Sequence, residues 1–522
     1  MTDCQGSSAR PVGLAATRRA SLALLALMLC VYGATTGGSV ATDLASYEVT
    51  RSIVEHGSVA MSFNVLDTEA ERGVDGRYYA PVGIGHPLYS VPFYLVARGA
   101  QQTLRLRIGK PESLTKAGVV AGSAVASALV VLVVFRFALS LTGVPGAAAG
   151  VALACGLGTT LWPYSKFGFN APLAALAVLA GTYWVWLGAR RGRDSLLALG
   201  AACLGFGALT RHELFVLAIP TIGWLWLEST RVRQFTRRLL VFSLPMVMAL
   251  GVWLSYNYIR FGHPLDTGLW RDPAVRFDGP MLAGLHGLLL SPGRSLLLYN
   301  PLVVLGLVSL TWLFRRDRNT ALLVGGTAVT LLLVIARMRQ WDGGESYGPR
   351  YLVPVVPVLL LPIAPWLAAG RRRWTFWILL IVGVLVQLPG ILVDFSKVQH
   401  EYARRHPGYA IDQSRYTWDA SPLVLDTAAA IAAIPENARF VFGLAVPPDV
   451  RQSGAEVQRD FSQQFSFSLD FWWLYLFYLG AVPAWVSVGL VGLLGTGAVC
   501  SAWTLCRAIG ASRGWSDAGS TS

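Results

Sequence analysis

The stretch RMRQWDGGESYGPRYLVPVVP, residues 337–357, separates two strongly apolar segments at 320–336 and 351–369. Its polar part, 337–350, contains three Arg, an Asp, a Glu, a Trp and three Gly. Because apolar segments of this length cross or approach a bilayer, the polar part is expected at the boundary between membrane and water. So much polarity at one boundary predicts the mouth of a helical bundle, and we interpret this mouth as one wall of an active site.

The composition indicates a polytopic membrane protein. The chain has 522 residues, 54% hydrophobic and 14% charged, and its mean hydropathy is +0.50. Soluble domains carry about 25% charged residues. The net charge of +14 does not indicate a nucleic-acid partner, because the basic residues stand in short clusters between apolar segments. No long polar loop holds a pair of the six Cys, so neither a disulfide framework nor a Cys-based zinc site is expected.

We predict an all-α fold with about 12 transmembrane helices. The first outer loop, 39–115, is expected to hold surface helices, one at about 44–56, because Pro81, Pro87 and Pro92 argue against a regular span. The predicted spans are 20–38, 117–139, 146–162, 171–189, 195–210, 214–228, 239–258, 296–314, 320–336, 351–369, 374–394 and 472–506.

The same pattern divides the chain into four parts. A cytoplasmic tail (1–19) precedes the transmembrane core (20–394). A small outer cap (395–471) follows, with one helix expected near 424–434 that ends before Pro435. The last transmembrane helix and a second cytoplasmic tail complete the chain (472–522).

Four basic clusters predict the orientation. They fall in the even-numbered loops, which are cytoplasmic if the first span begins inside. The three long loops and all seven His then face outward. We therefore expect a multi-pass protein of the inner (plasma) membrane, with its chemically capable groups at the outer face. The clusters are RRGR (190–193), RVRQFTRR (231–238), RRDR (315–318) and RRR (371–373).

Asp43, just beyond the first span, is the candidate catalytic group. A carboxylate at this depth can take the proton from an acceptor hydroxyl if its geometry and pKa allow. Asp43 is also well placed as the N-cap of the helix at 44–56, and one carboxylate can do both. Glu48 is a secondary candidate, although such a residue more often belongs to a solvated face. His86 lies in a Tyr-, Gly- and Pro-rich stretch (77–94) that either shapes a substrate pocket or forms an interfacial aromatic belt.

Cations at the outer boundary are candidate phosphate ligands. Lys166 follows the third span and can pair with a phosphate or reach lipid headgroups. Arg211 lies in the turn TRHE with His212 and Glu213. Its guanidinium can bind a phosphate through two hydrogen bonds, or pair with Glu213.

The central segment WDGGESYGPR (341–350) supplies further candidates. Its three Gly permit tight turns, and Arg350 begins the next apolar segment, where it can clamp a phosphate. One acidic pair, Asp342 and Glu345, is a weak metal signal, because dedicated sites need more oxygen ligands. We expect no cofactor, with a divalent cation left open, and an ordinary solvated turn is the alternative interpretation. The predicted substrate-binding residues here are Trp341, Asp342, Glu345, Tyr347 and Arg350.

Two motifs resemble a known class of enzyme. SPGRSLLLYNPLVVLGL (291–307) and WDGGESYGPRYLVPVVPVLLLPIA (341–364) resemble bacterial members of the GT-C membrane glycosyltransferases, the class of the protein O-mannosyltransferases and the lipid A aminoarabinose transferases. The architecture resembles that class over the whole chain, the sequence only in these motifs. Many relatives have two adjacent acidic residues early in the first outer loop, whereas Asp43 is followed by Leu44.

The resemblance implies transfer of a sugar from a polyprenyl-phosphate donor to a glycan, lipid or protein acceptor at the outer face. It implies Asp43 as the base, Lys166, Arg211 and Arg350 at the phosphate, and a single inverting displacement. The rival hypothesis is a lipid or solute transporter or flippase among the membrane lipids, which predicts inverted repeats and polar groups at mid-membrane. The sequence has no clear internal repeat and largely uncharged span centres, so we favour the transferase.

Overall fold

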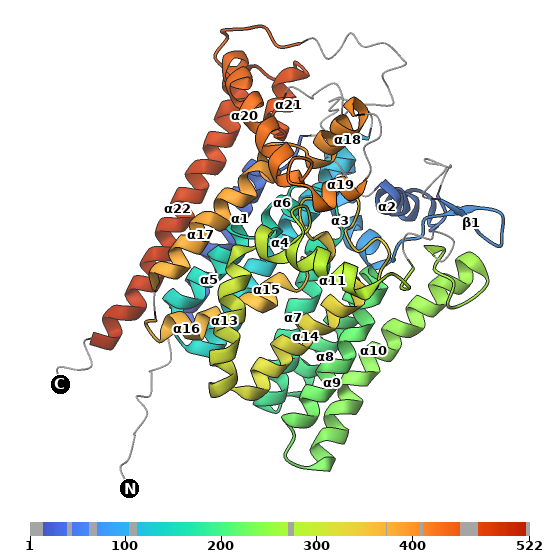
Figure 1. The fold of residues 1–522 in the computed structure, drawn as a ribbon, viewed down its shortest axis with the longest axis vertical. Coiled ribbons are helices and arrows are strands. Elements are labelled where there is room, and N and C mark those ends of the chain that lie inside the picture. The colour runs from blue at the N-terminus through green and yellow to red at the C-terminus, as the bar shows by residue number, and fades with distance from the viewer. Residues whose placement is uncertain are drawn as a thin grey trace.

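The computed structural model describes residues 14–38, 44–61, 70–103, 112–269, 276–371, 373–406, 411–448 and 468–517. Figure 1 shows a bundle of long helices with shorter helices gathered at its upper end. Within the described residues the strands are β1 (Glu71–Arg72) and β2 (Tyr78–Tyr79), which pair antiparallel in one short hairpin. The all-α prediction is therefore confirmed.

Seven helices of the described chain are long and apolar enough to cross a membrane. Each coincides with a predicted span, because each carries an apolar run of the length that a bilayer requires. The protein is thus a polytopic membrane protein. The seven helices are α1 (Leu14–Thr35), α4 (Ser113–Thr142), α7 (Ala171–Arg191), α10 (Val232–Phe261), α14 (Arg318–Ala336), α17 (Arg373–Leu392) and α22 (Ala484–Asp517).

The remaining predicted spans form shorter or interrupted helices. The segment 296–314 breaks at Asn300, because Pro301 has no backbone N–H to continue the first helix. The single regular span expected at 351–369 is not formed either, since four prolines divide it into short pieces. These elements are α5 (Pro145–Leu157), α6 (Leu161–Ser165), α8 (Asp194–Thr210), η1 (His212–Leu217), α9 (Ala218–Leu227), α12 (Leu296–Tyr299), α13 (Pro301–Arg316), η4 (Arg350–Leu352), α15 (Val356–Leu360) and α16 (Ile363–Ala368).

The basic loops meet at one end of the bundle. Arg190, near the end of α7, pairs with Asp317 before α14 at 2.7 Å and with Glu228 after α9 at 3.1 Å. Arg237 of α10 pairs with Asp194 at the start of α8 at 2.6 Å. In Figure 1, α9, α16 and the end of α22 lie toward this lower side. We call it the inner end, in line with the predicted cytoplasmic loops.

The opposite, outer end carries the helices of the first loop. The helix expected at 44–56 is confirmed as α2 (Leu44–His56), and the Thr50 hydroxyl donates to the Pro87 carbonyl of α3 (Gly85–Thr103) at 3.4 Å. Pro92 lies inside α3, so the carbonyl of Leu88 loses its helical donor. Leu88 is on an exposed side of the helix, where solvent or lipid headgroups can serve that carbonyl.

The cap lies over the bundle at the same end (Figure 1). The helix predicted at 424–434 runs on through Pro435 to residue 441, so the expected end before Pro435 is wrong. The carbonyl that loses its donor is that of Ile431, a residue 66% exposed, and water can replace the missing bond. The helices here are α11 (Met281–Leu290), α18 (Phe395–Arg405), α19 (Ile411–Tyr416), α20 (Pro422–Val441) and α21 (Trp472–Tyr478).

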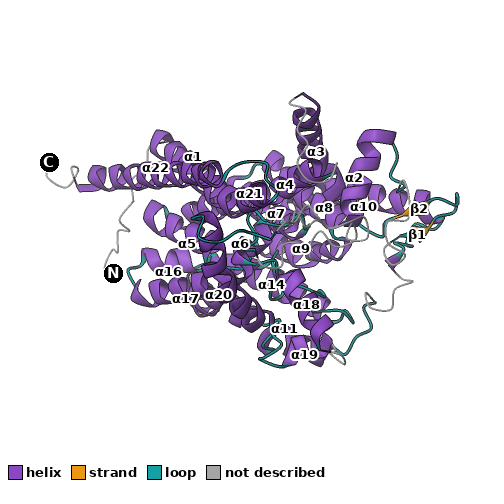
Figure 2. Cartoon of the chain, turned by 90° about the horizontal axis from the view of Figure 1, so that it is seen from above, coloured by secondary structure: helices purple, strands orange, loops and turns teal. Residues whose placement is uncertain are grey.

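Seen from above, the outer end has two sides. Figure 2 places α11, α18 and α19 together on one side, and α2 with the β1–β2 hairpin on another. The backbone N–H of Gly293 donates to the Arg415 carbonyl of α19 at 3.1 Å, which joins the turn after α11 to the cap. The central stretch 337–350 contacts the same side, because Asp342 pairs with Arg415 of α19 and the Trp341 ring packs against Gly287 of α11.

Candidate active site

The stretch 337–350 folds into a series of tight turns. Gly343, Gly344 and Gly348 have φ of 78°, 68° and 69°, a left-handed backbone that glycine adopts without strain, as predicted. Asp342 Oδ2 accepts a hydrogen bond from the Gly344 N–H at 3.2 Å. The turns therefore hold the Asp342 carboxylate in place with no exposed surface.

Asp342 joins this stretch to the cap. Arg415 of α19 donates from Nη2 to Asp342 Oδ1 at 2.7 Å, and the two side chains are 15% and 0% exposed. The Arg415 guanidinium also lies 5.5 Å from the ring centre of Trp341. Gly287 of α11 packs so closely that an added Cβ would lie 1.9 Å from the Trp341 ring. The stretch, α11 and α19 thus form one packed wall rather than the solvated turn of the alternative interpretation.

Arg350 is a partly buried cation at the start of η4. Its guanidinium stands 4.2 Å from the ring centre of Phe169. Its Nε atom is buried without a hydrogen-bond partner, and no carboxylate of the described chain forms an ion pair with it. Placing a charge away from water without a counter-charge is costly. Arg350 therefore keeps donors available for an anionic ligand.

Arg294, in the turn between α11 and α12, is a second such cation and is fully buried. It donates to the carbonyls of Gly293 at 2.8 Å and Gly344 at 2.7 Å, and to Gln399 Oε1 at 3.4 Å. Its Nε atom has no partner, and no described carboxylate lies within ion-pair distance. Gly293 is required here, because an added Cβ would lie 1.8 Å from the Ser414 carbonyl oxygen.

Arg294 and Arg350, which we call the arginine pair, act on the same region. Both lie within electrostatic reach of the Tyr164 hydroxyl, which donates to the Tyr347 carbonyl at 3.3 Å. Their positive charges are not matched by an ion pair within the described residues. The arginine pair therefore fits an anion such as a phosphate.

Arg211, His212 and Glu213 lie at the junction of α8 and η1. Arg211 Nε donates to Glu213 Oε1 at 2.7 Å, and its guanidinium lies 4.8 Å from the ring centre of Tyr351. The pair foreseen as the alternative is thus formed, with side chains 5% and 8% exposed. His212 stacks on Trp253 with ring centres 6.1 Å apart. The charged residues within electrostatic reach of the Tyr351 hydroxyl are Arg350, Arg211, Glu213 and Asp342.

Glu345 and Tyr347 have different surroundings. The Glu345 carboxylate is 50% exposed and lies 3.9 Å from His400 Nδ1 of α18. Tyr347 is fully buried, packs edge-on against Tyr299 with ring centres 5.0 Å apart, and donates from its hydroxyl to the Val386 carbonyl. The contacts of Tyr347 are those of a packed core residue, whereas Glu345 faces the edge of the cap.

Glu48 and His86 lie on α2 and α3. Glu48 is 2% exposed, and this burial raises the pKa of its carboxyl group, with Arg51 at 3.7 Å opposing the shift. It therefore does not belong to a solvated face. His86 is also 2% exposed, and its neighbour Gly85 packs so tightly that an added Cβ would lie 2.5 Å from Thr210 Oγ1. Thr210 directly precedes Arg211, so the start of α3 borders the Arg211–Glu213 pair.

Asp43 lies outside the described residues, and so do its predicted roles as base and N-cap. The flanks of this segment are described. Gly38 packs against Tyr475, where an added Cβ would lie 2.5 Å from the ring, and Leu44 begins α2.

Lys166 has its partners within the fold. Its Nζ lies 2.9 Å from Asp470 Oδ2, with the two side chains 0% and 1% exposed. The same Nζ donates to the carbonyls of Ile391 at 2.7 Å and Val393 at 3.1 Å. The ammonium group thus has a counter-charge at ion-pair distance and uses two of its three protons in hydrogen bonds to carbonyls. Lys166 thus links α6 to the end of α17 and to the segment before α21.

Asp426 of α20 is a buried carboxyl group next to this ion pair. Neither of its oxygens has a hydrogen-bond partner. Burial raises its pKa well above the usual 3.8, and Asp394 adds to the shift while Lys166 and Arg294 oppose it. Burial therefore favours the protonated, uncharged form of this carboxyl group.

Metal binding has little support in the described part of the chain. No group of three His, Cys, Asp or Glu side chains there is arranged to hold a metal ion. Asp342 and Glu345, the acidic pair of the central stretch, have separate partners in Arg415 and His400.

The sequence reasoning did not single out Arg294, Arg415, Asp426 or Asp470. Arg294 had a signal, because in SPGRS it stands just before an apolar run, separated from it by Ser295, much as Arg350 begins one. Arg415 and Asp470 had none, since each acquires its importance from a partner distant in the chain.

No protein-family model matches the chain, and no curated protein matches it. Solved structures are similar to it in fold. ArnT from Cupriavidus metallidurans bound to undecaprenyl phosphate has 15% identity and a TM-score of 0.43, over 94% of this chain and 75% of that chain. Apo ArnT has 14% identity and a TM-score of 0.41, over 95% and 74%. The apo oligosaccharyltransferase of Archaeoglobus fulgidus has 10% identity and a TM-score of 0.47, over 90% and 64%.

These structures are glycosyltransferases of the GT-C class. The motifs at 291–307 and 341–364 resemble the same class, and the similarity to these solved structures is one of fold alone. At these identities and TM-scores it carries no residue roles over to this chain, and the chain's own side chains must support any function.

Proposed function

We propose that this protein transfers a sugar from a polyprenyl-phosphate donor to an acceptor at the outer face of the plasma membrane. The observation that carries the proposal is the arginine pair. Its two guanidinium groups stand at the outer end of a transmembrane bundle with no ion-pair partner among the described residues. A phosphate on a lipid anchor would bring the missing negative charge to this depth. Its oxygens would accept hydrogen bonds from the N–H groups that have no partner.

The surrounding residues suit the other parts of such a donor. The prenyl chain would lie between the apolar helices. Arg211 and Glu213 border Tyr351 together with Arg350, so they would contact the phosphate or the sugar hydroxyls. Trp341 and Asp342 would shape the wall on the side of the cap. Lys166, which has a buried counter-charge in Asp470 and donates to two carbonyls, would hold the fold rather than the phosphate.

The proposed reaction is a single displacement. The acceptor oxygen attacks the anomeric carbon, while the bond from that carbon to the phosphate oxygen breaks and the centre inverts. The phosphate leaves with the bonding electron pair, and the arginine pair stabilises the added negative charge. Asp43 takes the proton of the acceptor hydroxyl as general base. Glu48 is the next carboxylate along the same segment.

The acceptor, a glycan, a lipid or a protein, would approach between the first loop and the cap. Glu345 would line this approach at the edge of the cap, and the buried His86 and Glu48 would lie behind its other side, in the helices of the first loop. Support comes from the packing of α3 against Thr210, next to Arg211, and of the Gly293 turn against Ser414 of the cap. Both sides of the outer end thus border the residues assigned to the donor.

The test is sugar transfer by purified protein with labelled polyprenyl-phosphate sugars and cell-envelope acceptors. We expect Asp43→Asn to reduce transfer by about 10²–10⁴-fold, the usual contribution of a general base, with an unchanged melting temperature. Asp75→Asn is the matched control in the same outer loop, because that carboxylate is exposed and pairs with Arg77.

Two other outcomes would revise the proposal. Equal transfer by the wild type and Asp43→Asn would move the base elsewhere, and Glu48→Gln would be the next variant. No transfer from any donor, together with movement of lipid across vesicles containing the protein, would replace the transferase with a transporter.

A further inference from the structure

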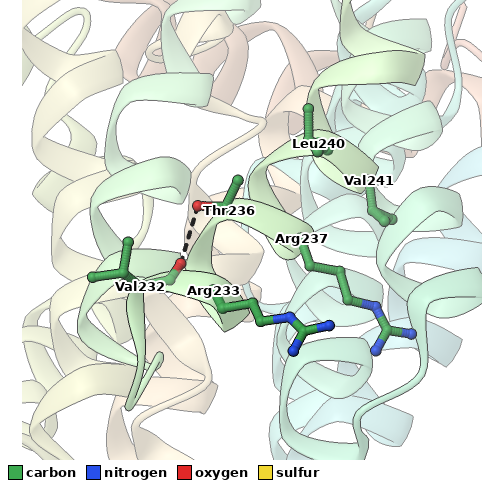
Figure 3. A pocket seen from close by; sticks show the side chains of 6 residues that line it. All are labelled: Val232, Arg233, Thr236, Arg237, Leu240 and Val241. Carbon is green, nitrogen blue, oxygen red and sulfur yellow. Dashed lines mark hydrogen bonds between the residues drawn. The ribbon is translucent and has the colours of Figure 1, made fainter.

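Two hollows lie at the inner end of the bundle, far from the arginine pair. The first is lined by one helix only, α10, through Val232, Arg233, Thr236, Arg237, Leu240 and Val241 (Figure 3). Figure 3 shows Arg233 and Arg237 pointing to the same side of the helix. Arg237 is already paired with Asp194 at 2.6 Å. A single helix face offers a ligand no opposing wall, so this hollow is not a built site.

The second hollow, which we call the inner groove, lies between α5, α16, α17 and α22. It encloses about 450 Å³, within the range of about 300–1,000 Å³ typical of small-molecule sites. Most of its lining is apolar, and Arg373, the first residue of α17, is the charged residue among the described side chains that line it. The apolar lining includes Gly150, Leu153, Leu367, Phe376, Leu505 and Cys506.

The helices around the inner groove carry cations without carboxylates. The described parts of α1, α5, α16 and α17, and α22 up to residue 510, contain no Asp or Glu. The other half of the inner end differs, because there Arg190 pairs with Asp317 and Arg237 with Asp194. The arginines at the inner ends of the helices near the groove are Arg18, Arg19, Arg371, Arg373 and Arg507.

This excess charge has a natural partner in the membrane. The cytoplasmic leaflet carries anionic lipids, and each Lys or Arg near its surface contributes about 1 kcal/mol of attraction. Trp374 and Trp377 are 63% and 56% exposed on the first turns of α17, at the level where Trp meets lipid headgroups. The inner groove therefore suits a phospholipid. Its apolar lining matches an acyl chain, and Arg373 matches the phosphate.

We propose that the inner groove binds an anionic phospholipid of the inner leaflet. An acyl chain lies along Leu153, Leu367 and Phe376, and Arg373 holds the headgroup phosphate. The site is separate from the arginine pair at the outer end. It stands whether or not the protein is a transferase.

Two cysteines of α22 allow a direct test. Both cysteines are exposed on this helix, and Cys506 lines the groove whereas Cys500 does not. The full-length protein in neutral detergent is titrated with phosphatidylglycerol or phosphatidylcholine, and maleimide alkylation of each thiol is followed by peptide mass spectrometry. Phosphatidylglycerol should slow alkylation of Cys506 about fivefold more than phosphatidylcholine does, the ratio that about 1 kcal/mol corresponds to. The rate at which maleimide alkylates Cys500 should be the same in the presence of either lipid.

Substitutions separate the headgroup contact from apolar packing. Arg373→Gln should remove the preference for phosphatidylglycerol, and Arg373→Lys should retain most of it. Arg233→Gln is the matched control, because Arg233 is also an inner-end arginine but belongs to the single-helix hollow. Its protein should behave as the wild type does.

Three results would overturn the proposal. Equal protection of Cys506 by both lipids would show that lipid binds the groove through apolar packing alone, with no preference for an anionic headgroup. Protection by phosphatidylglycerol that persists in Arg373→Gln would show that Arg373 does not hold the headgroup phosphate. Protection by undecaprenyl phosphate but not by phosphatidylglycerol would assign the groove to the donor lipid.

Discussion

The two ends of the bundle use charged residues in opposite ways. At the inner end, the side chains of Arg237 and Asp194 are 71% and 36% exposed. At the outer end, those of Lys166 and Asp470 are 0% and 1% exposed. Exposed ion pairs contribute about 0–1 kcal/mol to stability, whereas removing one partner of a buried pair costs about 3–5 kcal/mol.

This difference in exposure suggests different roles for the charges at the two ends: orientation in the membrane at the inner end and the proposed function at the outer end. Exposed arginines at the inner end need no special surroundings, and in the predicted orientation they keep that end in the cytoplasm. Several charges at the outer end are removed from water, unlike the exposed Arg339–Asp278 pair, and such burial is costly unless each charge has a partner. Lys166 and Asp342 have such partners, but Arg294 and Arg350 do not among the described residues. The proposed phosphate site rests on these two unmatched cations.

The largest effect on stability is expected at the buried pair. Lys166→Met leaves Asp470 buried without its counter-charge, so the free energy of unfolding should fall by about 3–5 kcal/mol. Denaturant unfolding in detergent measures it. The double variant Lys166→Met/Asp470→Leu should recover most of the loss. A stable Lys166→Met protein that no longer binds a polyprenyl phosphate would instead restore Lys166 as a phosphate ligand.

A smaller, pH-dependent effect is expected at Asp426. In the unfolded chain this group ionises near 3.8, whereas burial keeps it protonated to much higher pH in the folded protein. Its contribution to stability is therefore complete below that value and is lost as the pH rises toward the folded pKa. The wild-type melting temperature should fall more steeply than that of Asp426→Asn as the pH rises above about 3.8. Parallel curves would show that Asp426 is ionised in the folded protein.

The smallest effect is expected at the inner end. Arg237→Gln removes one partner of an exposed ion pair, so the free energy of unfolding should change by less than about 1 kcal/mol. The same denaturant titration measures it. A loss as large as that of Lys166→Met would remove the distinction between the two ends.

The sequence predicted most of the fold, because hydrophobic length and basic loops act locally. The spans that became α1, α4, α7 and α10 follow from apolar runs alone. The prediction of a regular span at 351–369 is wrong because hydropathy measures only how apolar a segment is. It takes no account of the prolines that divide the helix. The helix that continues past Pro435 fails in the opposite direction, since exposed backbone there can lose one hydrogen bond at low cost.

The site was predicted in part for a similar reason. Arg350, Asp342 and Arg211 could be singled out because they interrupt apolar sequence at a predicted boundary. Their partners could not, since Arg415 reaches Asp342 only through the folded cap. Lys166 has a buried partner in Asp470, whereas Arg350 has no ion-pair partner among the described residues. The local sequence around each cation does not indicate this difference, because the partner is distant in the chain.

The most direct test of the account is the affinity of purified protein for undecaprenyl phosphate, measured for the wild type, Arg350→Gln and Arg339→Gln. Arg339 is the matched control, because it belongs to the same polar stretch but is 48% exposed and paired with Asp278 at 2.5 Å. We predict that Arg350→Gln weakens binding by about 10–100-fold, the loss of charge-assisted hydrogen bonds worth about 1.5–3 kcal/mol, while Arg339→Gln binds as the wild type does. Equal affinity in all three proteins, or an equal loss in both variants, would contradict a phosphate site at the arginine pair.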